Sequence, residues 1–147
     1  MIDSRCHLNF KKLSENFENI IKNAKKNNIT SILSINTKPE DFNDHLNLIK
    51  KYKSIYLSYG LHPSDVISSN QIKLENFDTF CNNEKVIGIG ETGIDLYHND
   101  KYIKEQIKVF ETHIDASIKH SLPIIIHQRN SETEIIDILK NYKSNNL

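Results

Sequence analysis

The stretch Val86-Ile87-Gly88-Ile89-Gly90-Glu91-Thr92-Gly93-Ile94-Asp95 decides how the rest of the chain is interpreted. Its apolar run over residues 86–89 predicts a buried strand, and Gly90-Glu91 is expected to end that strand. Glu91 then lies at the carboxyl end of the strand, which is where α/β proteins place their chemistry. Glu91 is therefore the first candidate for a catalytic or metal-binding residue.

The same stretch contains the glycine spacing of a dinucleotide-binding fingerprint, at Gly88, Gly90 and Gly93. That fingerprint requires a helix to begin directly after the glycines, because the N-terminus of the helix holds the pyrophosphate. Residues 94–100 show no helical period and end in turn formers. We therefore interpret the glycines as turn and close-packing residues, and nucleotide binding is the weaker alternative.

The composition predicts one domain over residues 1–147. The chain has a formal net charge of zero and 37% hydrophobic residues, which suits a single domain with a real core. Charged residues of both signs are mixed, so no global field draws the protein toward nucleic acid or membrane. Cys6 and Cys81 lack metal-type spacing. With no leader pattern and no run of about 18 apolar residues, we expect a reduced, cytoplasmic protein with no membrane partner.

Apolar β-type runs alternate with segments of helical period along the chain. Strands are expected from Met1 toward His7 and over residues 29–35, 54–59, 86–89 and 123–126. Helices are expected after Ser14 as N-cap, from Pro39, over residues 71–81 and 101–120, and after the capping box at Ser131-x-x-Glu134. The polar tail over residues 141–147 is expected to fray.

Five βα units in succession predict an α/β protein with a parallel sheet, because parallel strands need helical crossovers. The pattern leaves two architectures open, a doubly wound open sheet and part of an eight-fold barrel. A complete barrel usually takes about 250 residues, so this chain would supply about five of the eight βα units.

Four of the predicted strands are followed by a residue that can bind a metal or a phosphate, namely His7, His62, Glu91 and His127. The carboxyl ends of parallel strands meet at one face, so these residues can share a site. Neutral imidazole and carboxylate together suit Zn, Mn or Fe better than Ca. A single histidine at a strand end is more often only a hydrogen-bonding residue, and Glu91 alone could belong to an ion pair. All four at the same end of successive strands favour a shared metal site.

The remaining polar residues have weaker assignments. Arg129 lies two positions after His127 on the same face, and it could hold a phosphate with its planar fork or form a surface ion pair. Asp95 is expected to brace the loop after Glu91 or to orient a metal ligand. Of the other histidines, His45, His98 and His120 are expected to be solvated, and His113 is expected to be a hydrogen-bonded residue at the edge of the core.

Four ordered motifs resemble the TatD family of metal-dependent deoxyribonucleases. They are Ile2-Asp3-Ser4-Arg5-Cys6-His7-Leu8, Gly60-Leu61-His62-Pro63, the stretch 87–95 and the stretch 122–129, and Gln106, Phe110 and His113 also match the family pattern. The resemblance runs along essentially the whole chain. It implies a (β/α)8 TIM barrel related to the amidohydrolases, one or two divalent metal ions (Mg, Mn or Zn, not distinguished), and hydrolysis of DNA phosphodiester bonds. By motif position it implies that His7, Glu91 and His127 are metal ligands and that His62 lines the substrate site.

Two departures from the family pattern bear on this expectation. The family opens with His-x-His, whereas this chain has Arg5-x-His7. Arginine has no lone pair to give and does not deprotonate, so Arg5 cannot replace an imidazole ligand and places a positive charge beside the metal. The family pattern also continues past residue 147 with a further His and an Asp ligand. We therefore expect a barrel truncated at its C-terminus, which is either only marginally stable or pairs its open edges with a second copy or with a separate C-terminal barrel fragment.

Taken together, the sequence predicts a partial (β/α)8 barrel hydrolase that cleaves DNA with metal-activated water. Glu91 is the expected catalytic residue, and His62 and Arg129 are expected to bind the phosphate. The alternative is a catalytically impaired fragment or an interaction module that retains the scaffold. Arg5 and the ligands expected beyond residue 147 favour that alternative.

Overall fold

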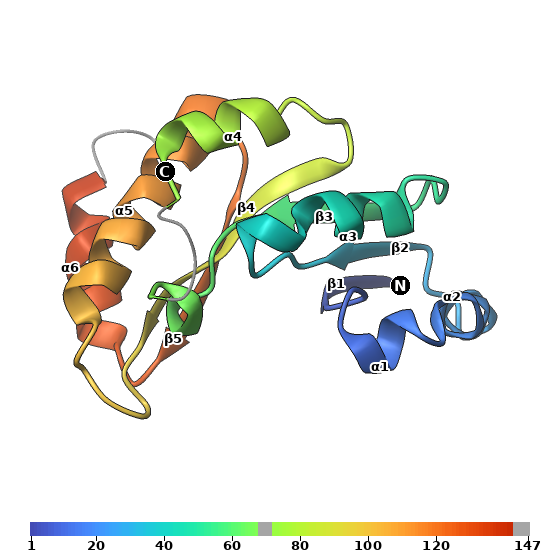
Figure 1. Cartoon of the computed structure of the whole chain (residues 1–147), viewed down its shortest axis with the longest axis horizontal. Coiled ribbons are helices and arrows are strands. Elements are labelled where there is room, and N and C mark those ends of the chain that lie inside the picture. The colour runs from blue at the N-terminus through green and yellow to red at the C-terminus, as the bar shows by residue number, and fades with distance from the viewer. Residues whose placement is uncertain (68–71, 143–147) are drawn as a thin grey trace.

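Five parallel strands form one sheet in the order β1-β2-β3-β4-β5 (Figure 1). The computed structural model describes residues 1–67 and 72–142. The strands are β1 (Ile2–Cys6), β2 (Ser31–Ser34), β3 (Ile55–Tyr59), β4 (Val86–Asp95) and β5 (Ile124–Arg129). All five lie where the sequence predicted a strand; β1, β2 and β3 are slightly shorter than predicted, and β4 and β5 continue beyond their predicted ends.

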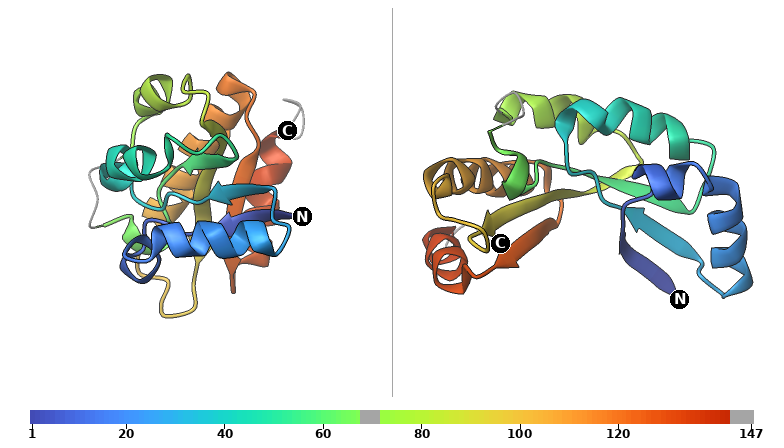
Figure 2. Two further views of the ribbon diagram at one scale, coloured as in Figure 1. Left: turned by 90° about the vertical axis from the view of Figure 1, so that its right-hand side faces the viewer. Right: turned by 60° about the horizontal axis from the view of Figure 1, so that its bottom comes forward.

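The consecutive strand order decides between the two architectures that the sequence left open. A doubly wound sheet reverses its strand order near the middle, so that its helices cover both faces. Here each strand is added beside the one before it. Because the crossovers between parallel strands are right-handed, the helices all fall on one face and the sheet curves away from them. Figure 2 shows this curvature, with the helices around the outside. The fold is therefore a half-barrel, and the doubly wound alternative is wrong for the described residues.

The helices connect the strands along the convex side of the sheet (Figures 1 and 2). They are α1 (Lys11–Ser14), α2 (Phe17–Lys26), α3 (Phe42–Ile49), α4 (Leu74–Phe80), α5 (Ile103–His120) and α6 (Glu132–Tyr142), with 3-10 turns η1 (Pro39–Asp41) and η2 (Pro63–Asp65). Ser14 ends α1 and does not cap α2, whose N-cap is Asn16. Of the residues predicted for the fourth helix, Gln71 lies outside the described residues. No helix in the described ranges is long and apolar enough to cross a membrane.

Two clusters of buried apolar side chains hold the helices on the sheet. The larger cluster lies under α2, α3 and α4 and is centred on the strand residues Ile55, Leu57 and Tyr59, which alternate toward the helices. The smaller cluster joins β4 to α5 and α6 through Ile94 and four helix residues, Phe110, Ile114, Ile135 and Ile138. Phe110 and Ile114 thus lie on the buried face of α5, the long helix predicted over residues 101–120.

Strand β4 is longer than the sequence predicted, and this corrects the interpretation of the opening stretch. The strand continues through Gly90 and Glu91 to Asp95, with a register irregularity against β5 between Ile89 and Thr92. Glycine permits the continuation, because Gly90 and Gly93 have φ values of +123° and +143°. A Cβ atom at Gly93 would lie 2.0 Å from the carbonyl oxygen of His127.

The same finding removes the nucleotide-binding alternative. The three glycines of the apparent fingerprint all lie inside β4, and the next helix, α5, begins only at Ile103. No helix N-terminus therefore stands beside these glycines in the described residues, as a bound pyrophosphate would require. Their role is close packing, as expected, since each of the three brings β4 near β5.

Candidate metal centre

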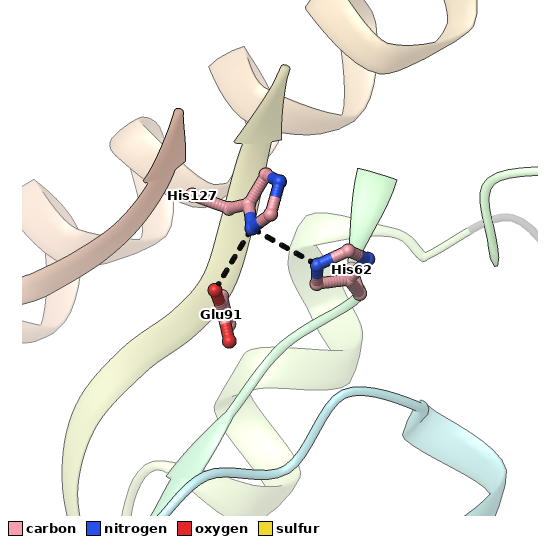
Figure 3. A group of neighbouring side chains, drawn as sticks. All are labelled: His62, Glu91 and His127. Carbon is pink, nitrogen blue, oxygen red and sulfur yellow. Dashed lines mark hydrogen bonds and ion pairs between the residues drawn. The ribbon is translucent and has the colours of Figure 1, made fainter. Parts of the chain in front are cut away.

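Three side chains from adjacent strands meet at one point near the mouth of the half-barrel. One nitrogen of His62, one carboxylate oxygen of Glu91 and one nitrogen of His127 lie within 4.8 Å of one another (Figure 3). His62 follows β3 and precedes η2, Glu91 lies in β4, and His127 lies in β5. The sheet register explains the meeting, because these three strands are neighbours and parallel. Of the residues the structure describes, only these three form such a group.

The spacing of the three ligand atoms fits one divalent ion. His127 Nδ1 lies 3.1 Å from Glu91 Oε1 and 3.1 Å from His62 Nε2. Nitrogen and oxygen ligands bind zinc at about 2.1 Å, so two neighbouring ligand atoms on one tetrahedral ion are separated by roughly 3.4 Å, which is close to both distances. Two imidazoles and one carboxylate are also a donor set that zinc, manganese and iron accept. The residues present therefore fit a divalent transition metal.

Each imidazole is held by a second contact that leaves its other nitrogen toward the shared point. His127 Nε2 lies 3.0 Å from Asp95 Oδ2, so this nitrogen can donate to the carboxylate while Nδ1 faces Glu91. His62 Nδ1 lies 2.7 Å from Ser64 Oγ, and its Nε2 faces His127. Metal-binding histidines usually carry such an anchor on the second nitrogen, because it fixes the tautomer and the ring orientation. The contact between Asp95 and His127 therefore supports the predicted role of Asp95 in orienting a metal ligand.

The electrostatics of the centre favour an ionised Glu91. Burial raises the pKa of this carboxyl, but the hydrogen bond with His127 and the positive charge of Arg5 outweigh burial, and the net pKa lies below the ordinary value. The pKa of His127 is raised, mainly by its contact with Glu91, whereas burial lowers the pKa of His62. An ion that binds here must displace the proton shared between His127 and Glu91, so its affinity should increase with pH.

Arg5 contacts the centre from β1. Its Nη2 donates to Oε1 of Glu91, the same oxygen that faces His127. The Arg5 side chain is 56% exposed, whereas Glu91 is 1% exposed. A positive charge was expected beside the metal at this position, and the guanidinium lies on the candidate ligand itself.

His7 is not part of the group that the structure brings together. Its Nδ1 lies 3.2 Å from the carbonyl oxygen of Ile35, and its ring stacks on Phe10. The trio predicted from the sequence was His7, Glu91 and His127, and the observed trio contains His62 in place of His7. His62 follows β3, the neighbour of β4, whereas β1 is separated from β4 by two strands. A ligand role for His7 stays a prediction.

Arg129 lies at the exposed end of β5, outside the group. Its guanidinium is stacked over the ring of Tyr97, 3.4 Å from the ring centroid. In the sheet register it pairs with Asp95, the residue that anchors His127. Arg129 is therefore close to the centre but held on an aromatic side chain, and its predicted contact with a phosphate stays a prediction.

Three further histidines show where sequence reasoning succeeded and failed. His113 is fully buried, with Nε2 accepting from the Leu61 amide at 3.0 Å and Nδ1 lying 2.7 Å from the Val109 carbonyl oxygen, as expected of a satisfied core histidine. The prediction for His45 was wrong, because this residue is 1% exposed and lies 2.8 Å from Ser34 Oγ. It occupies the buried stripe of α3, three residues after Phe42. His98 is exposed, as predicted.

The prediction for His120 was also wrong. Its side chain is 12% exposed, and its Nε2 lies 3.0 Å from an oxygen of Asp78. This contact links the end of α5 to α4, and it was not predictable because the two residues are 42 positions apart along the chain.

Asn36 is a candidate residue that the sequence analysis missed. Its carbonyl oxygen accepts from the backbone N–H of Glu91 at 3.3 Å, and its side chain is fully buried. Neither amide atom of that side chain has a hydrogen-bond partner among the described residues. An unpaired buried amide costs roughly 1–3 kcal/mol, so Asn36 is suited to bond to a ligand that reaches Glu91. It follows β2, the one strand to which no site residue was assigned.

A half-barrel of parallel strands with a His-Glu-His group near its mouth belongs to the class of metal-binding (β/α) barrels. Within that class, the family model described as TatD related DNase matches residues 2–147. The chain therefore belongs to the TatD-related DNase family.

Known relatives support this assignment. The chain is 38% identical to a metal-dependent hydrolase of Buchnera aphidicola subsp. Baizongia pistaciae, over 98% of this chain and 55% of the relative. It is 33% identical to the metal-dependent hydrolase YabD of Bacillus subtilis, over 95% of this chain and 55% of that protein. The crystal structure of YjjV, a TatD homologue from Escherichia coli, superimposes with a TM-score of 0.89 at 26% identity, over 97% of this chain and 56% of YjjV. The chain thus spans about half the length of these relatives.

Proposed function

We propose that this protein is a metal-dependent hydrolase that cleaves phosphodiester bonds in DNA. The observation that carries the proposal is the convergence of His62, Glu91 and His127 on one point with the spacing of ligands to a single ion. Membership of the TatD-related DNase family supports both the metal and the class of bond. The relatives named above are described as metal-dependent hydrolases, which supports the coarser part of the proposal.

The residues of the centre have separate roles in binding the ion and in orienting its ligands. Glu91, His62 and His127 would hold the ion, and Asp95 and Ser64 keep the two imidazoles oriented. A divalent ion bound there would lower the pKa of a water molecule and polarise a phosphoryl oxygen. Arg129, near the end of β5, supplies a positive charge for the phosphate chain of the substrate, and the exposed guanidinium suits that contact.

The test compares the wild-type protein with the variant Glu91→Gln, which keeps the shape of the side chain and removes its charge. We expect the wild type to bind Zn²⁺ or Mn²⁺ in calorimetry and to hydrolyse a DNA oligonucleotide only when the ion is present. Glu91→Gln should lose both properties. His98→Gln is the matched control, because His98 is exposed and outside the group. Equal metal binding and equal hydrolysis in wild type and Glu91→Gln would refute the proposal.

A second candidate function is a non-catalytic scaffold, and one observation favours it. The guanidinium of Arg5 already occupies an oxygen of Glu91, so a metal must share or displace that contact. A scaffold without catalytic function should show no micromolar binding of divalent ions and no hydrolysis at any ion concentration. The calorimetric titration of the wild type therefore separates the two functions.

A further inference from the structure

The ion pair of Arg5 with Glu91 involves only Nη2 of the guanidinium group. A guanidinium carries five N–H donors. Among the residues that the structure describes, the Arg5 side chain makes one hydrogen bond, from Nη2 to Glu91 Oε1. More than half of the side chain is exposed, so its other donors are accessible from the solvent. The centre therefore has a fixed cation anchored on one of its own ligands.

The anchoring contact also defines where that cation sits. Oε1 of Glu91 accepts from Arg5 and lies 3.1 Å from His127 Nδ1, so the guanidinium and the candidate ion share one oxygen. The guanidinium stays positive at every working pH. A group that approaches the ion from the mouth of the half-barrel thus meets a second positive charge on the β1 side. His7, which follows β1, lies against Ile35 and Phe10 and is not part of the group among the described residues.

We propose that Arg5 forms an oxyanion site at the edge of the metal centre and binds the phosphoryl group of the substrate beside a single ion. This inference rests on the proposed function, because it concerns the substrate of that same centre. The guanidinium is a planar fork that donates two parallel hydrogen bonds to phosphate oxygens, and such charge-assisted bonds are about twice as strong as neutral ones. Arg5 then acts as a substrate-binding cation in the position where the family pattern has a histidine.

The net charge of the metal-loaded centre favours a phosphodiester over a phosphomonoester. Glu91 and Asp95 are the two carboxylates that contact His127, and each contributes one negative charge. A divalent ion neutralises these two carboxylates, and the charge of Arg5 remains. One excess positive charge matches the single negative charge of a phosphodiester better than the two charges of a phosphomonoester. The centre is thus suited to internal linkages of a nucleic acid.

The proposal predicts effects of opposite sign on two ligands. Replacing Arg5 by alanine frees Glu91 for the ion, so the affinity for Zn²⁺ should rise several-fold. The same replacement removes the oxyanion donors, so the affinity of the zinc-loaded protein for a phosphodiester should fall about tenfold. If Arg5 only blocked metal binding and did not bind the substrate, its replacement would raise the affinity for zinc without lowering the affinity for the phosphodiester.

The experiment uses dimethyl phosphate as the phosphodiester and the neutral trimethyl phosphate as its control ligand. Binding to the zinc-loaded protein is followed by phosphorus NMR, and zinc affinity is measured separately by calorimetry. We compare wild type, Arg5→Ala, Arg5→Lys and the control variant Lys12→Ala, which removes an exposed cation outside the centre. We expect tighter zinc binding and weaker dimethyl phosphate binding in Arg5→Ala, a smaller loss in Arg5→Lys, and no change in Lys12→Ala.

Equal affinity of Arg5→Ala and wild type for dimethyl phosphate at saturating zinc would overturn the oxyanion site. Should Arg5→Ala fail to fold, Arg5→Lys decides the question in the same way, since it keeps the charge and loses the fork. Absence of zinc binding in the wild type would instead refute the proposed function, so the two failures are distinguishable.

Discussion

Gly93 shows how a single residue without a side chain can hold the centre together. It lies in β4 with φ of +143°, and a Cβ atom added there would lie 2.0 Å from the carbonyl oxygen of His127. The neighbouring strand would have to move at the residue that carries the candidate ligand. Only glycine permits both the backbone conformation and the close approach. The glycine thus positions His127 against Glu91 without contacting either side chain.

We predict that Gly93→Ala lowers the free energy of unfolding by roughly 2–4 kcal/mol, because steric overlap adds to backbone strain. Gly88→Ala is the matched control in the same strand, since its Cβ would lie 3.1 Å from the flexible end of Ile125 and 3.4 Å from the Pro123 carbonyl oxygen, without a severe overlap. Urea unfolding of both variants measures the difference. Equal losses in the two variants would contradict the argument from close approach.

The buried imidazole of His113 makes the stability of the fold depend on pH, and this dependence does not involve the metal centre. Burial lowers the pKa of this imidazole from 6.5 to about 4. The unfolded chain therefore binds a proton more readily than the folded protein between these pH values. The stabilisation is fully present above pH 6.5 and is lost as the pH falls from 6.5 toward 4.

Because of this pKa shift, we expect His113 to lower the free energy of unfolding by about 2 kcal/mol when the pH falls from 7 to 5. The variant His113→Gln keeps an acceptor for the Leu61 amide and cannot be protonated. We expect its unfolding free energy to change less between these two pH values than that of the wild type, by about this amount. Urea titrations at both pH values provide the measurement, and parallel behaviour of the two proteins would show that His113 does not contribute.

The individual residues also show the limit of prediction from sequence. Glu91, His127 and His62 were predictable as site residues, because their position after apolar runs is visible in the sequence. The choice between His7 and His62 as the third member of the group was not predictable from strand ends. That choice depends on which strands are neighbours of β4, and on the Arg5 contact that occupies Glu91 from the β1 side. His45 and Asn36 were missed because burial depends on the packing of α3 and β2.

At the scale of elements, α5 connects the core to the centre. Gln106 is a buried residue of this helix, and its Oε1 accepts from the Asp95 amide at 2.9 Å. Its Nε2 donates to the Asp95 carbonyl oxygen at 3.2 Å. Asp95 in turn holds His127 through its carboxylate. One helix side chain thereby fixes the end of β4 and, through Asp95, the orientation of a candidate metal ligand.

We predict that Gln106→Leu weakens binding of Zn²⁺ by about 10–100-fold, the loss typical for residues that orient a metal ligand. Leucine fills a similar volume but leaves the Asp95 backbone groups unpaired. Lys104→Leu is the control, because it places the same side chain at an exposed position of the same helix. Calorimetry with each variant gives the affinities. Unchanged affinity in Gln106→Leu would show that Asp95 keeps its position without the amide.

Most of the helices and strands were predictable from the sequence, and the length of β4 is the exception. The five strands and the long helix follow from apolar runs and from helical periodicity, which are local patterns. The continuation of β4 beyond Gly90 was not predictable, because glycine in a sequence normally marks a turn. Here it marks close contact with β5, a tertiary effect that no local pattern contains. The functional stretch is therefore a bulged strand and not a strand followed by a loop.

At the scale of the whole molecule, the curved sheet ends in two strands with one neighbour each. Strand β1 pairs only with β2 and strand β5 only with β4 in the described part of the chain. Figure 1 shows the two strands at opposite ends of the sheet. The number and type of βα units predicted a parallel α/β sheet, whereas the choice of a half-barrel over a doubly wound sheet required the strand order. Edge strands with free backbone groups are templates for pairing with another chain.

We propose that these edges cause self-association and predict that Ile2→Lys weakens it. Ile2 is 66% exposed on β1, and a charged side chain on an edge strand opposes pairing. Ile136→Lys is the matched control, because Ile136 is 52% exposed on α6, at the other end of the molecule from β1 (Figure 1). Sedimentation velocity over a range of concentrations should show association in the wild type and in Ile136→Lys, and less in Ile2→Lys. If Ile136→Lys dissociates the protein and Ile2→Lys does not, the contact is made by the exposed apolar face of α6 and not by the edge of the sheet.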